Sequence, residues 1–440
     1  MKQYIDFFIS ERQKIDESCS PLLNSFRENA FESFRRTGFP VYRSENYQYT
    51  DVSGLLKDDF GFYLNLWNPG INPHKVFFCN VPNLNAYKYF VVNGHFFQET
   101  EKDLPEGVYL GSLNFFAERY PELFSKYYNQ QAAQKDDGLT AFNTMFVQDG
   151  YVLYVPENVI LEKAIQLTNI SQGNVDSLIN RRILVILERG AQAKLMICDH
   201  TNEDKVMSAA TQVVEIYAGE NASFDCYELE ESTGNTVRLT NNFVRQDASS
   251  SVIVNNITLS NGFTRNNYQI DLIGKRAETH LQGLAIADEQ QTIDNFTLIN
   301  HHASGCRSNE LFKYLLDDEA TGVFNGKMVV SPDAQKTEAY QSNRNLLGNR
   351  NCRMYSQPAL EINADDVKCS HGMTTGQLDE AALFYMRARG ISYDEAVLML
   401  KFAFTGDVLK GIRLEGLRDR LKLLIEKRLR GELIKCQECF

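Results

Sequence analysis

Residue types that bind metals and sulfur are most densely placed between positions 365 and 371, which hold Asp365, Asp366, Cys369 and His371. In an extended strand, residues i and i+2 project to the same side, so Cys369 and His371 would present a thiolate and an imidazole together. This pair of donors suits iron, an iron–sulfur cluster or zinc. Two ligands do not complete such a site, so a partner or small thiols would have to supply the others.

These residues also have an ordinary structural interpretation. Isolated Cys/His pairs are common, and Cys369 and His371 could be a buried thiol beside a hydrogen-bonded histidine. Asp365 and Asp366 could form a catalytic pair, but adjacent strand residues point to opposite faces, which favours a turn or capping role. From these residue types alone, the structural interpretation is favoured.

Motifs for nucleotide sites and closed zinc sites are missing from the sequence. It contains no Gly-x-x-x-x-Gly-Lys-Ser/Thr phosphate loop, no Gly-x-Gly-x-x-Gly, no Gly-x-Ser-x-Gly and no His-Glu-x-x-His. Cys436 and Cys439 have knuckle spacing, but they stand at the extreme C-terminus and have no second pair. A tetrahedral site would need two more ligands from elsewhere, so we expect no metal there.

Composition sets the broad class. The 440 residues are 43% hydrophobic and 23% charged, which is ordinary for a soluble protein of two or three domains. A formal charge of -12 argues against a generic nucleic-acid binder. No run approaches the ~18 apolar residues of a membrane span, and the start lacks signal-peptide features. The nine scattered cysteines form no disulfide framework. We therefore expect a cytoplasmic protein.

Strand-like runs dominate residues 138–368 and carry a weak repeat. Short β-branched and aromatic runs are separated by turns near positions 190, 219, 247 and 274, which are 29, 28 and 27 residues apart. A period of this length indicates stacked units, and the lack of helical periodicity favours a β-solenoid or a sandwich. Frequent asparagines could align into ladders between stacked turns, or could simply mark turns.

The N-terminal region reads as helical with a small β element. One helix is expected to start at Ser20-Pro21, where a capping hydroxyl precedes proline, and to end at Gly38. A β excursion is expected over 77–97 and a second helix over 113–128. The polar stretch 130–138 reads as a linker to the β region.

After Gln377 the sequence is helical again. Ser392 and Glu395 have capping-box spacing, and a last helix places Leu414, Leu417, Leu421 and Leu424 on one face. This amphipathic, partly basic pair of helices is a candidate partner surface, although an ordinary solvated face would look the same. We therefore divide the chain into an N-terminal helical region with a small β element, a β core and a C-terminal helical domain, over residues 1–135, 136–372 and 373–440.

Several stretches resemble the SufD members of the SufB/SufD family, which belong to the SufBCD iron–sulfur cluster assembly complex. The most specific is Ala-Asp-Asp-Val-Lys-Cys-Ser-His-Gly at 364–372. The resemblance also covers residues 43–50, 146–156, 334–347, 358–363, 376–379 and 383–391. Tyr47 stands where the family usually has tryptophan, and Gly348 stands where a third leucine is common. Neither departure touches the candidate ligands.

The resemblance implies a right-handed parallel β-helix core between an N-terminal helical region and a C-terminal helical domain. It implies a non-enzymatic scaffold that pairs with a SufB-like β-helix subunit, or with a second copy of itself in isolation. The C-terminal helices would bind a SufC-like ABC ATPase, so this chain would bind no nucleotide. His371 would be a metal ligand near the SufB interface, where a transient iron–sulfur cluster forms, and Cys369 would be a candidate second ligand.

Three alternatives stay open. A SufB-type scaffold is similar over the β-helix and the C-terminal domain, but its characteristic cysteine-containing segment is not evident. A β-helix carbohydrate-active enzyme would use carboxylates such as Asp271, Asp294 and Asp317. A purely structural adaptor would have no metal at 369–371.

Overall fold

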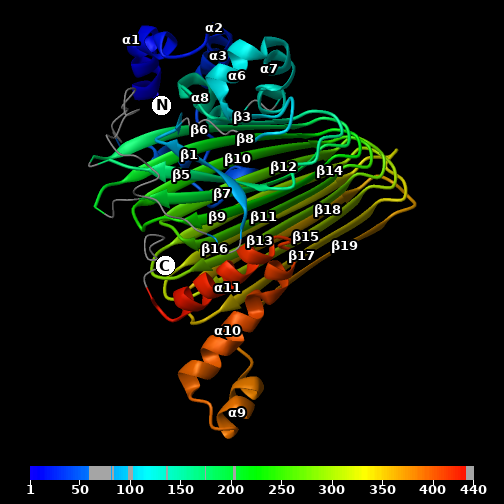
Figure 1. The fold of residues 1–440 in the computed structure, drawn as a ribbon. Coiled ribbons are helices and arrows are strands. Elements are labelled where there is room, and N and C mark those ends of the chain that lie inside the picture. Colours follow the sequence, from blue (N-terminus) through cyan, green and yellow to red (C-terminus); the bar gives the residue numbers. More distant parts are fainter. Residues whose placement is uncertain are drawn as a thin grey trace.

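The computed structural model describes residues 1–58, 81, 84–97, 103–134, 137–173, 175–201 and 205–432. Its centre is a parallel β-solenoid formed by two long sheets, with helices packed on both (Figure 1). The ten strands of sheet A, in chain order, are β1 (Ala86–Val92), β2 (His95–Phe97), β5 (Ala164–Ser171), β7 (Gln192–Thr201), β9 (Ser223–Glu231), β11 (Ser251–Ser260), β13 (Glu278–Ala287), β15 (Arg307–Leu316), β17 (Glu338–Leu347) and β19 (Lys368–Gly376).

The nine strands of sheet B are β3 (Tyr109–Ser112), β4 (Tyr151–Val155), β6 (Ser177–Leu187), β8 (Ser208–Ala218), β10 (Thr236–Gln246), β12 (Phe263–Leu272), β14 (Thr292–His301), β16 (Thr321–Val330) and β18 (Arg353–Ile362). From β4 onward the chain alternates between the sheets, and each strand pairs in parallel with the strand one turn later. Only β1–β2 and β3–β4 pair antiparallel among the described strands. The prediction of a parallel β-helix core flanked by helices is confirmed.

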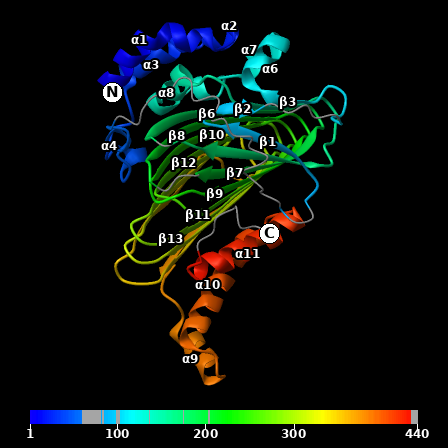
Figure 2. The ribbon, with the colours of Figure 1, turned by 60° about the vertical axis from the view of Figure 1, so that its left-hand side comes forward.

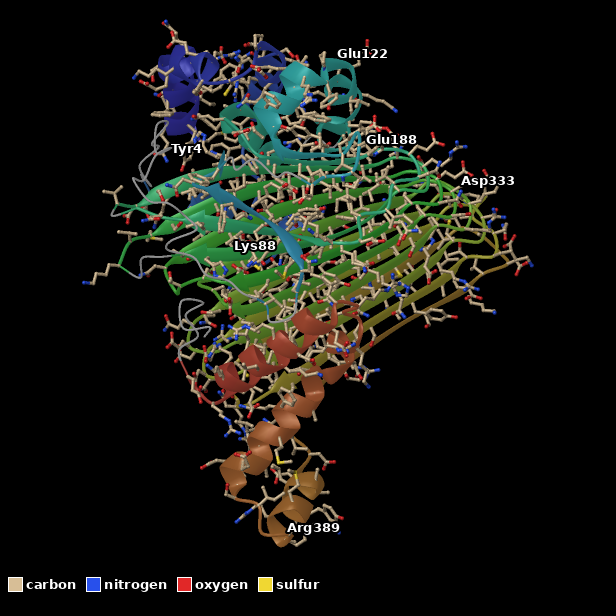
Figure 3. The ribbon with its side chains drawn as sticks, viewed as in Figure 1. Tyr4, Lys88, Glu122, Glu188, Asp333 and Arg389 are labelled. Atoms are coloured by element: carbon tan, nitrogen blue, oxygen red, sulfur yellow. The ribbon has the colours of Figure 1, made fainter. Side chains whose placement is uncertain are left out.

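The register explains the repeat seen in the sequence. Ser223 pairs with Ser251, Ser251 with Glu278, and Glu278 with Arg307, so successive turns advance by 28, 27 and 29 residues. The turns near 190, 219, 247 and 274 all lie at the corner where sheet B leads into sheet A. Figure 3 shows this corner at Glu188 and Asp333. The sequence repeat is therefore one turn of the solenoid.

Amide ladders form between turns, as the frequent asparagines suggested. Asn267 donates a side-chain hydrogen bond to Asn241 at 2.6 Å, and the two residues are register partners. Asn266 donates to Asn295 in the same way at 2.9 Å inside the solenoid. Each ladder satisfies amide groups that stacking would otherwise bury without partners.

The N-terminal helices cover the outer face of sheet B at its N-terminal end (Figures 1 and 3). Tyr4, Phe8 and Phe142 pack with Leu178 and Val237 of that face in one buried apolar cluster. The helical segments here are α1 (Lys2–Glu17), α2 (Pro21–Asn24), α3 (Arg27–Thr37), η1 (Glu45–Tyr47), α4 (Val52–Leu55), α6 (Leu113–Arg119), α7 (Pro121–Tyr127), η2 (Ala132–Gln134) and α8 (Gly138–Phe146).

The helix predicted to start at Ser20-Pro21 is present, with the Ser20 hydroxyl accepting the Leu23 N–H, but it is divided into α2 and α3. Gly38 ends α3 with a φ of 65°, as predicted. The prediction of a single helix over 113–128 is wrong, because α6 ends at Arg119 and Pro121 starts a new helix. Proline lacks the backbone N–H that would continue α6. The β element expected over 77–97 appears as β1 and β2, although residues 77–80 lie outside the described ranges.

One further expectation fails at the start of the β region. Residues 138–146 read as the beginning of the strand-rich segment, but they form helix α8. Every residue of α8 is buried, between the N-terminal helices and sheet B, and its polar side chains Thr140, Asn143 and Thr144 make hydrogen bonds within that interior. The periodicity of so short a buried segment does not distinguish a helix from a buried strand.

The C-terminal helices are α9 (Glu380–Ala388), α10 (Tyr393–Lys410) and α11 (Glu415–Leu429). Helices α10 and α11 pack on the outer face of sheet A, and α9 extends beyond it (Figure 2). Leu417, Leu421 and Leu424 of α11 pack against apolar side chains of that face, so the predicted stripe is confirmed. The Ser392 hydroxyl accepts the Glu395 N–H at the start of α10, as the capping box predicted.

Candidate functional site at the open end of the solenoid

The last turn of the solenoid, β18 and β19, is the least covered part of the β region. β19 ends sheet A and β18 ends sheet B, and neither pairs with a further strand in the described ranges. Nearly all side chains of β19 are exposed, whereas alternate side chains of the preceding β17 are buried. An exposed strand edge presents unpaired N–H and C=O groups that can pair with another chain. We refer to this turn as the open end.

Both candidate ligands lie in β19 at this open end. Cys369 is in register with Ala339 of β17, and His371 is in register with Gln341. Cys369 packs against the apolar interior, so His371, two residues later, belongs to the same inward-facing row. The His371 side chain is exposed because no later turn covers it. The structure thus places the thiol and the imidazole on one row of the open end.

The two donors differ in their surroundings. Cys369 packs against the buried apolar cluster of Val330, Ala334 and Ala364, and burial raises the pKa of its thiol. A thiol with a raised pKa is mostly protonated, and the thiolate is the form that binds metal. His371 is more exposed than Cys369 and is therefore the more accessible donor.

Asp365 and Asp366 occupy the turn that precedes β19. The Lys336 N–H donates to the Asp366 carbonyl at 2.6 Å, and the Asp366 N–H donates to the Gln335 side chain at 2.9 Å. Lys336 and Asp366 also form an ion pair. These contacts fit the turn role that strand alternation favoured over a catalytic pair.

A buried carboxyl group that the sequence analysis did not identify lies two turns below His371 on the same row. Glu310 of β15 is in register with Gln341, and its side chain is fully buried. The Gln341 side-chain NH₂ donates to one Glu310 oxygen at 2.8 Å. No cation contributes to the shift in the pKa of Glu310. Burial raises the pKa of Glu310 to about 7.

This carboxyl group predicts a measurable pH dependence of stability. The pKa of Glu310 is about 7 in the folded chain against a reference value of 4.5, so the folded state binds more protons between these values. The contribution of Glu310 to the free energy of unfolding is fully present below pH 4.5 and is lost as pH rises through 7. The free energy of unfolding differs by about 3 kcal/mol between these two limits. Glu310→Gln is therefore expected to be more stable than the parent by up to this amount at pH 8, and equal to it near pH 4.5.

Urea denaturation at several pH values measures this difference. Glu106→Gln is the matched control, because Glu106 is exposed and its replacement should leave the pH profile unchanged. A Glu310→Gln profile parallel to that of the parent would contradict the prediction.

The carboxylates proposed for a carbohydrate-active enzyme do not form a common site. Asp294 is buried and paired with Arg265 at 2.5 Å. Asp317 pairs with Lys401 of α10 at 2.5 Å. Asp271 accepts a hydrogen bond from Asn300 at 2.7 Å on the outer face of sheet B. Two of the three therefore neutralise neighbouring cations.

Metal-ligand geometry is incomplete within the part of the chain that the structure describes. No group of three or more His, Cys, Asp or Glu side chains there could hold a metal ion. Cys436 and Cys439 lie outside the described residues. No helix of the described ranges is long and apolar enough to cross a membrane. Cys369 and His371 could therefore supply at most part of a coordination sphere.

Two family models together match nearly the whole sequence. Residues 1–167 match the SufBD protein N-terminal region. Residues 169–404, more than half of the chain, match the SufBD core domain of the SUF system for FeS cluster assembly. The second match includes the open end and both candidate ligands.

Individual relatives agree with these matches. An iron–sulfur cluster assembly SufBD family protein of Synechocystis sp. is 28% identical over 434 residues, covering 96% of this chain and 94% of that protein. Iron–sulfur cluster assembly protein SufD of Escherichia coli is 26% identical, covering 90% of each chain. SufD of Bacillus subtilis is 25% identical, covering 74% of this chain and 75% of its own. The chain belongs to the SufBD family of iron–sulfur cluster assembly proteins and is similar to its SufD members.

Proposed function

We propose that the chain is a non-enzymatic scaffold subunit that assembles iron–sulfur clusters together with a homologous β-helix subunit and an ABC-type ATPase in the cytoplasm. The observation that carries the proposal is the open end, where His371 lies on an uncovered inward row beside two unpaired strand edges. The cluster is cargo that forms there and leaves.

The open end suits pairing with another β-helix. β18 and β19 span 10 and 9 residues, longer than the average strand, and their outer edges are unpaired in the described structure. Natural proteins usually blunt or cover such edges because they associate with other strands. A homologous subunit with the same rise and strand spacing could continue both sheets across the interface. In this complex, the partner would supply the ligands that Cys369 and His371 lack.

The far tip of the C-terminal domain suits a second partner. Phe384 and Tyr385 of α9 are 75% and 57% exposed, and Tyr393 at the start of α10 is 54% exposed. Figure 3 places Arg389 at this tip, well away from the solenoid. A cluster of exposed aromatic residues on a protruding element is typical of an interaction site. We assign this tip to the ATPase, which would hydrolyse ATP that this chain does not bind.

Ion pairs link α10 and α11, which connect to this tip, to the solenoid. Lys313 of β15 donates to Asp407 of α10 at 2.8 Å and to the Phe404 carbonyl at 2.7 Å. Arg428 of α11 binds both carboxylate oxygens of Asp288 at 2.6 Å. Movement of an ATPase bound at α9 would therefore act on sheet A, whose last strand carries His371.

Co-purification tests the proposed function. The full chain, co-expressed with candidate partners, is expected to retain both an ABC-type ATPase and a homologous β-helix subunit. Replacing both Phe384 and Tyr385 by serine should lower ATPase retention by at least about ten-fold, because truncating central aromatic anchors commonly costs 2 kcal/mol or more. The β-helix partner should be retained, since we expect it to bind at β18 and β19 of the solenoid and not at α9.

Phe115→Ser is the matched control for this experiment. Phe115 is 46% exposed on α6, near the N-terminal end of the solenoid, and its replacement should leave both partners bound. Recovery of neither partner with the parent chain would refute the scaffold assignment. Recovery of both partners without cluster formation would favour the purely structural adaptor.

A further inference from the structure

The inward row that ends at His371 continues into the solenoid as a column of polar side chains. His371, Gln341 and Glu310 are successive register partners on β19, β17 and β15. Neighbouring strands lie about 4.8 Å apart, so side chains on one row can contact the next turn. Below Glu310, the column ends at apolar Leu281. Three polar groups therefore run from the open end to a closed apolar floor.

Gln341 connects the two ends of this column. Its side chain is 3% exposed, and its NH₂ group donates to Glu310 at 2.8 Å. Its side-chain oxygen has no hydrogen-bond partner in the described structure, although it is buried. A buried acceptor without a partner is costly, so its position beneath an exposed imidazole requires an explanation.

Gly326 of the opposite sheet holds this amide in place. A Cβ atom at residue 326 would lie 2.4 Å from the Gln341 nitrogen, so the amide packs directly on the β16 backbone. Gln341 therefore has little freedom to turn away from its row. Glu310 sets the orientation of the amide, because one of its carboxyl oxygens accepts the hydrogen bond from the NH₂ group at 2.8 Å. The amide oxygen is left for the next turn.

We propose that Gln341 is a positioning residue for His371: its unpartnered side-chain oxygen is the acceptor for one ring N–H of His371 when the exposed imidazole turns onto its register partner, and Glu310 holds the amide in the orientation this requires. The second ring nitrogen of His371 is then unprotonated and directed away from the solenoid. Ligand histidines commonly donate their other N–H to a carboxylate or carbonyl, which fixes the tautomer and the ring orientation. This inference rests on the proposed role of His371 and specifies how the chain prepares it.

Ring-nitrogen NMR of the full-length isolated chain, labelled with ¹⁵N, tests the inference without cluster or partner. Above the pKa of imidazole, the parent chain is expected to hold His371 predominantly in one neutral tautomer. In Gln341→Met, which keeps the volume but removes the acceptor, the tautomer ratio should fall about five-fold, the effect of one ordinary hydrogen bond. Gln341→Glu should restore the dominant tautomer, because a carboxylate accepts the same bond.

Gln357→Met is the matched control, since Gln357 lies in the same turn on the outer face and contacts Gln48 instead. It should leave the His371 signals unchanged, and His302 should be unaffected in every variant. If Gln341→Met does not fold, Gln341→Asn removes the hydrogen bond to His371 by shortening the side chain. It should lower the tautomer ratio of His371 by the same amount. Equal tautomer ratios in the parent, Gln341→Met and Gln341→Asn would overturn the inference. That result would leave the role of His371 itself standing, because cluster formation tests it separately.

Discussion

Replacing His371 by alanine is expected to lower iron–sulfur cluster formation in the reconstituted complex by at least about ten-fold, while leaving the complex assembled. Even loss of a group that only supports a metal ligand typically costs 10–100-fold in affinity or activity, and loss of the ligand itself should cost no less. The fold should tolerate the change, because His371 is exposed on the last strand and surface substitutions usually alter stability by less than about 0.5 kcal/mol.

The measurement is cluster yield, followed by visible absorption and by iron and sulfide content, with complex integrity checked by gel filtration. His302→Ala is the matched control: His302 is also exposed, but it lies on the outer face of sheet B beside Asp271. It should give full yield. An intact complex of His371→Ala with full yield would remove His371 from the assembly reaction.

The architecture explains why ligands and partners would gather at one end of the molecule. Helices cover the outer face of sheet A and the N-terminal part of the outer face of sheet B, and the last described turn exposes side chains on both its inner and outer faces. A solenoid can grow only at its ends, so an uncovered end suits addition of a second solenoid. His371 lies where the interior row of one solenoid would meet the other.

Much of the fold could be predicted from the sequence because a solenoid repeats. Turn residues near 190, 219, 247 and 274 recur with the period of one turn, and alternation places Cys369 and His371 on one side of a strand. The failures have local causes. Helix α8 is buried on all sides, and Pro121 divides a helix whose apolar pattern continues across the break.

The groups that support the candidate site were harder to predict. Gln341 and Glu310 precede His371 by 30 and 61 residues, which are close to one and two solenoid turns. Counting one and two repeat lengths back from His371 along the sequence leads to residues near Gln341 and Glu310. The repeat length, however, varies by several residues from one solenoid turn to the next. A shift of one residue moves a side chain to the opposite face, so the weak repeat could not select the inward row.

Glu215 gives the second large expected effect, this time on stability. The carboxylate lies on β8 with its side chain fully buried, and it pairs with the equally buried Arg182 at 2.7 Å. It also accepts the backbone N–H groups of Asn129, Gln131 and Ala132 at 2.8 to 3.2 Å. One side chain therefore attaches the segment before α8 to the solenoid.

Glu215→Ala is expected to lower the free energy of unfolding by about 3–5 kcal/mol, because it leaves a buried guanidinium without its counter-charge. Glu215→Gln should be less damaging, since its amide oxygen can still accept some of these hydrogen bonds. Urea denaturation measures both changes, and hydrogen exchange over residues 128–134 should increase in Glu215→Ala.

Glu157→Ala provides the comparison, because Glu157 also pairs with an arginine, Arg189, but the two side chains are 47% and 60% exposed. Solvent screens such a pair, so its removal should cost no more than about 1 kcal/mol. If Glu215→Ala cost as little as Glu157→Ala, the buried carboxylate would not be what attaches the segment before α8 to the solenoid. The apolar contacts of Phe142 in α8 would then have to hold this segment in place.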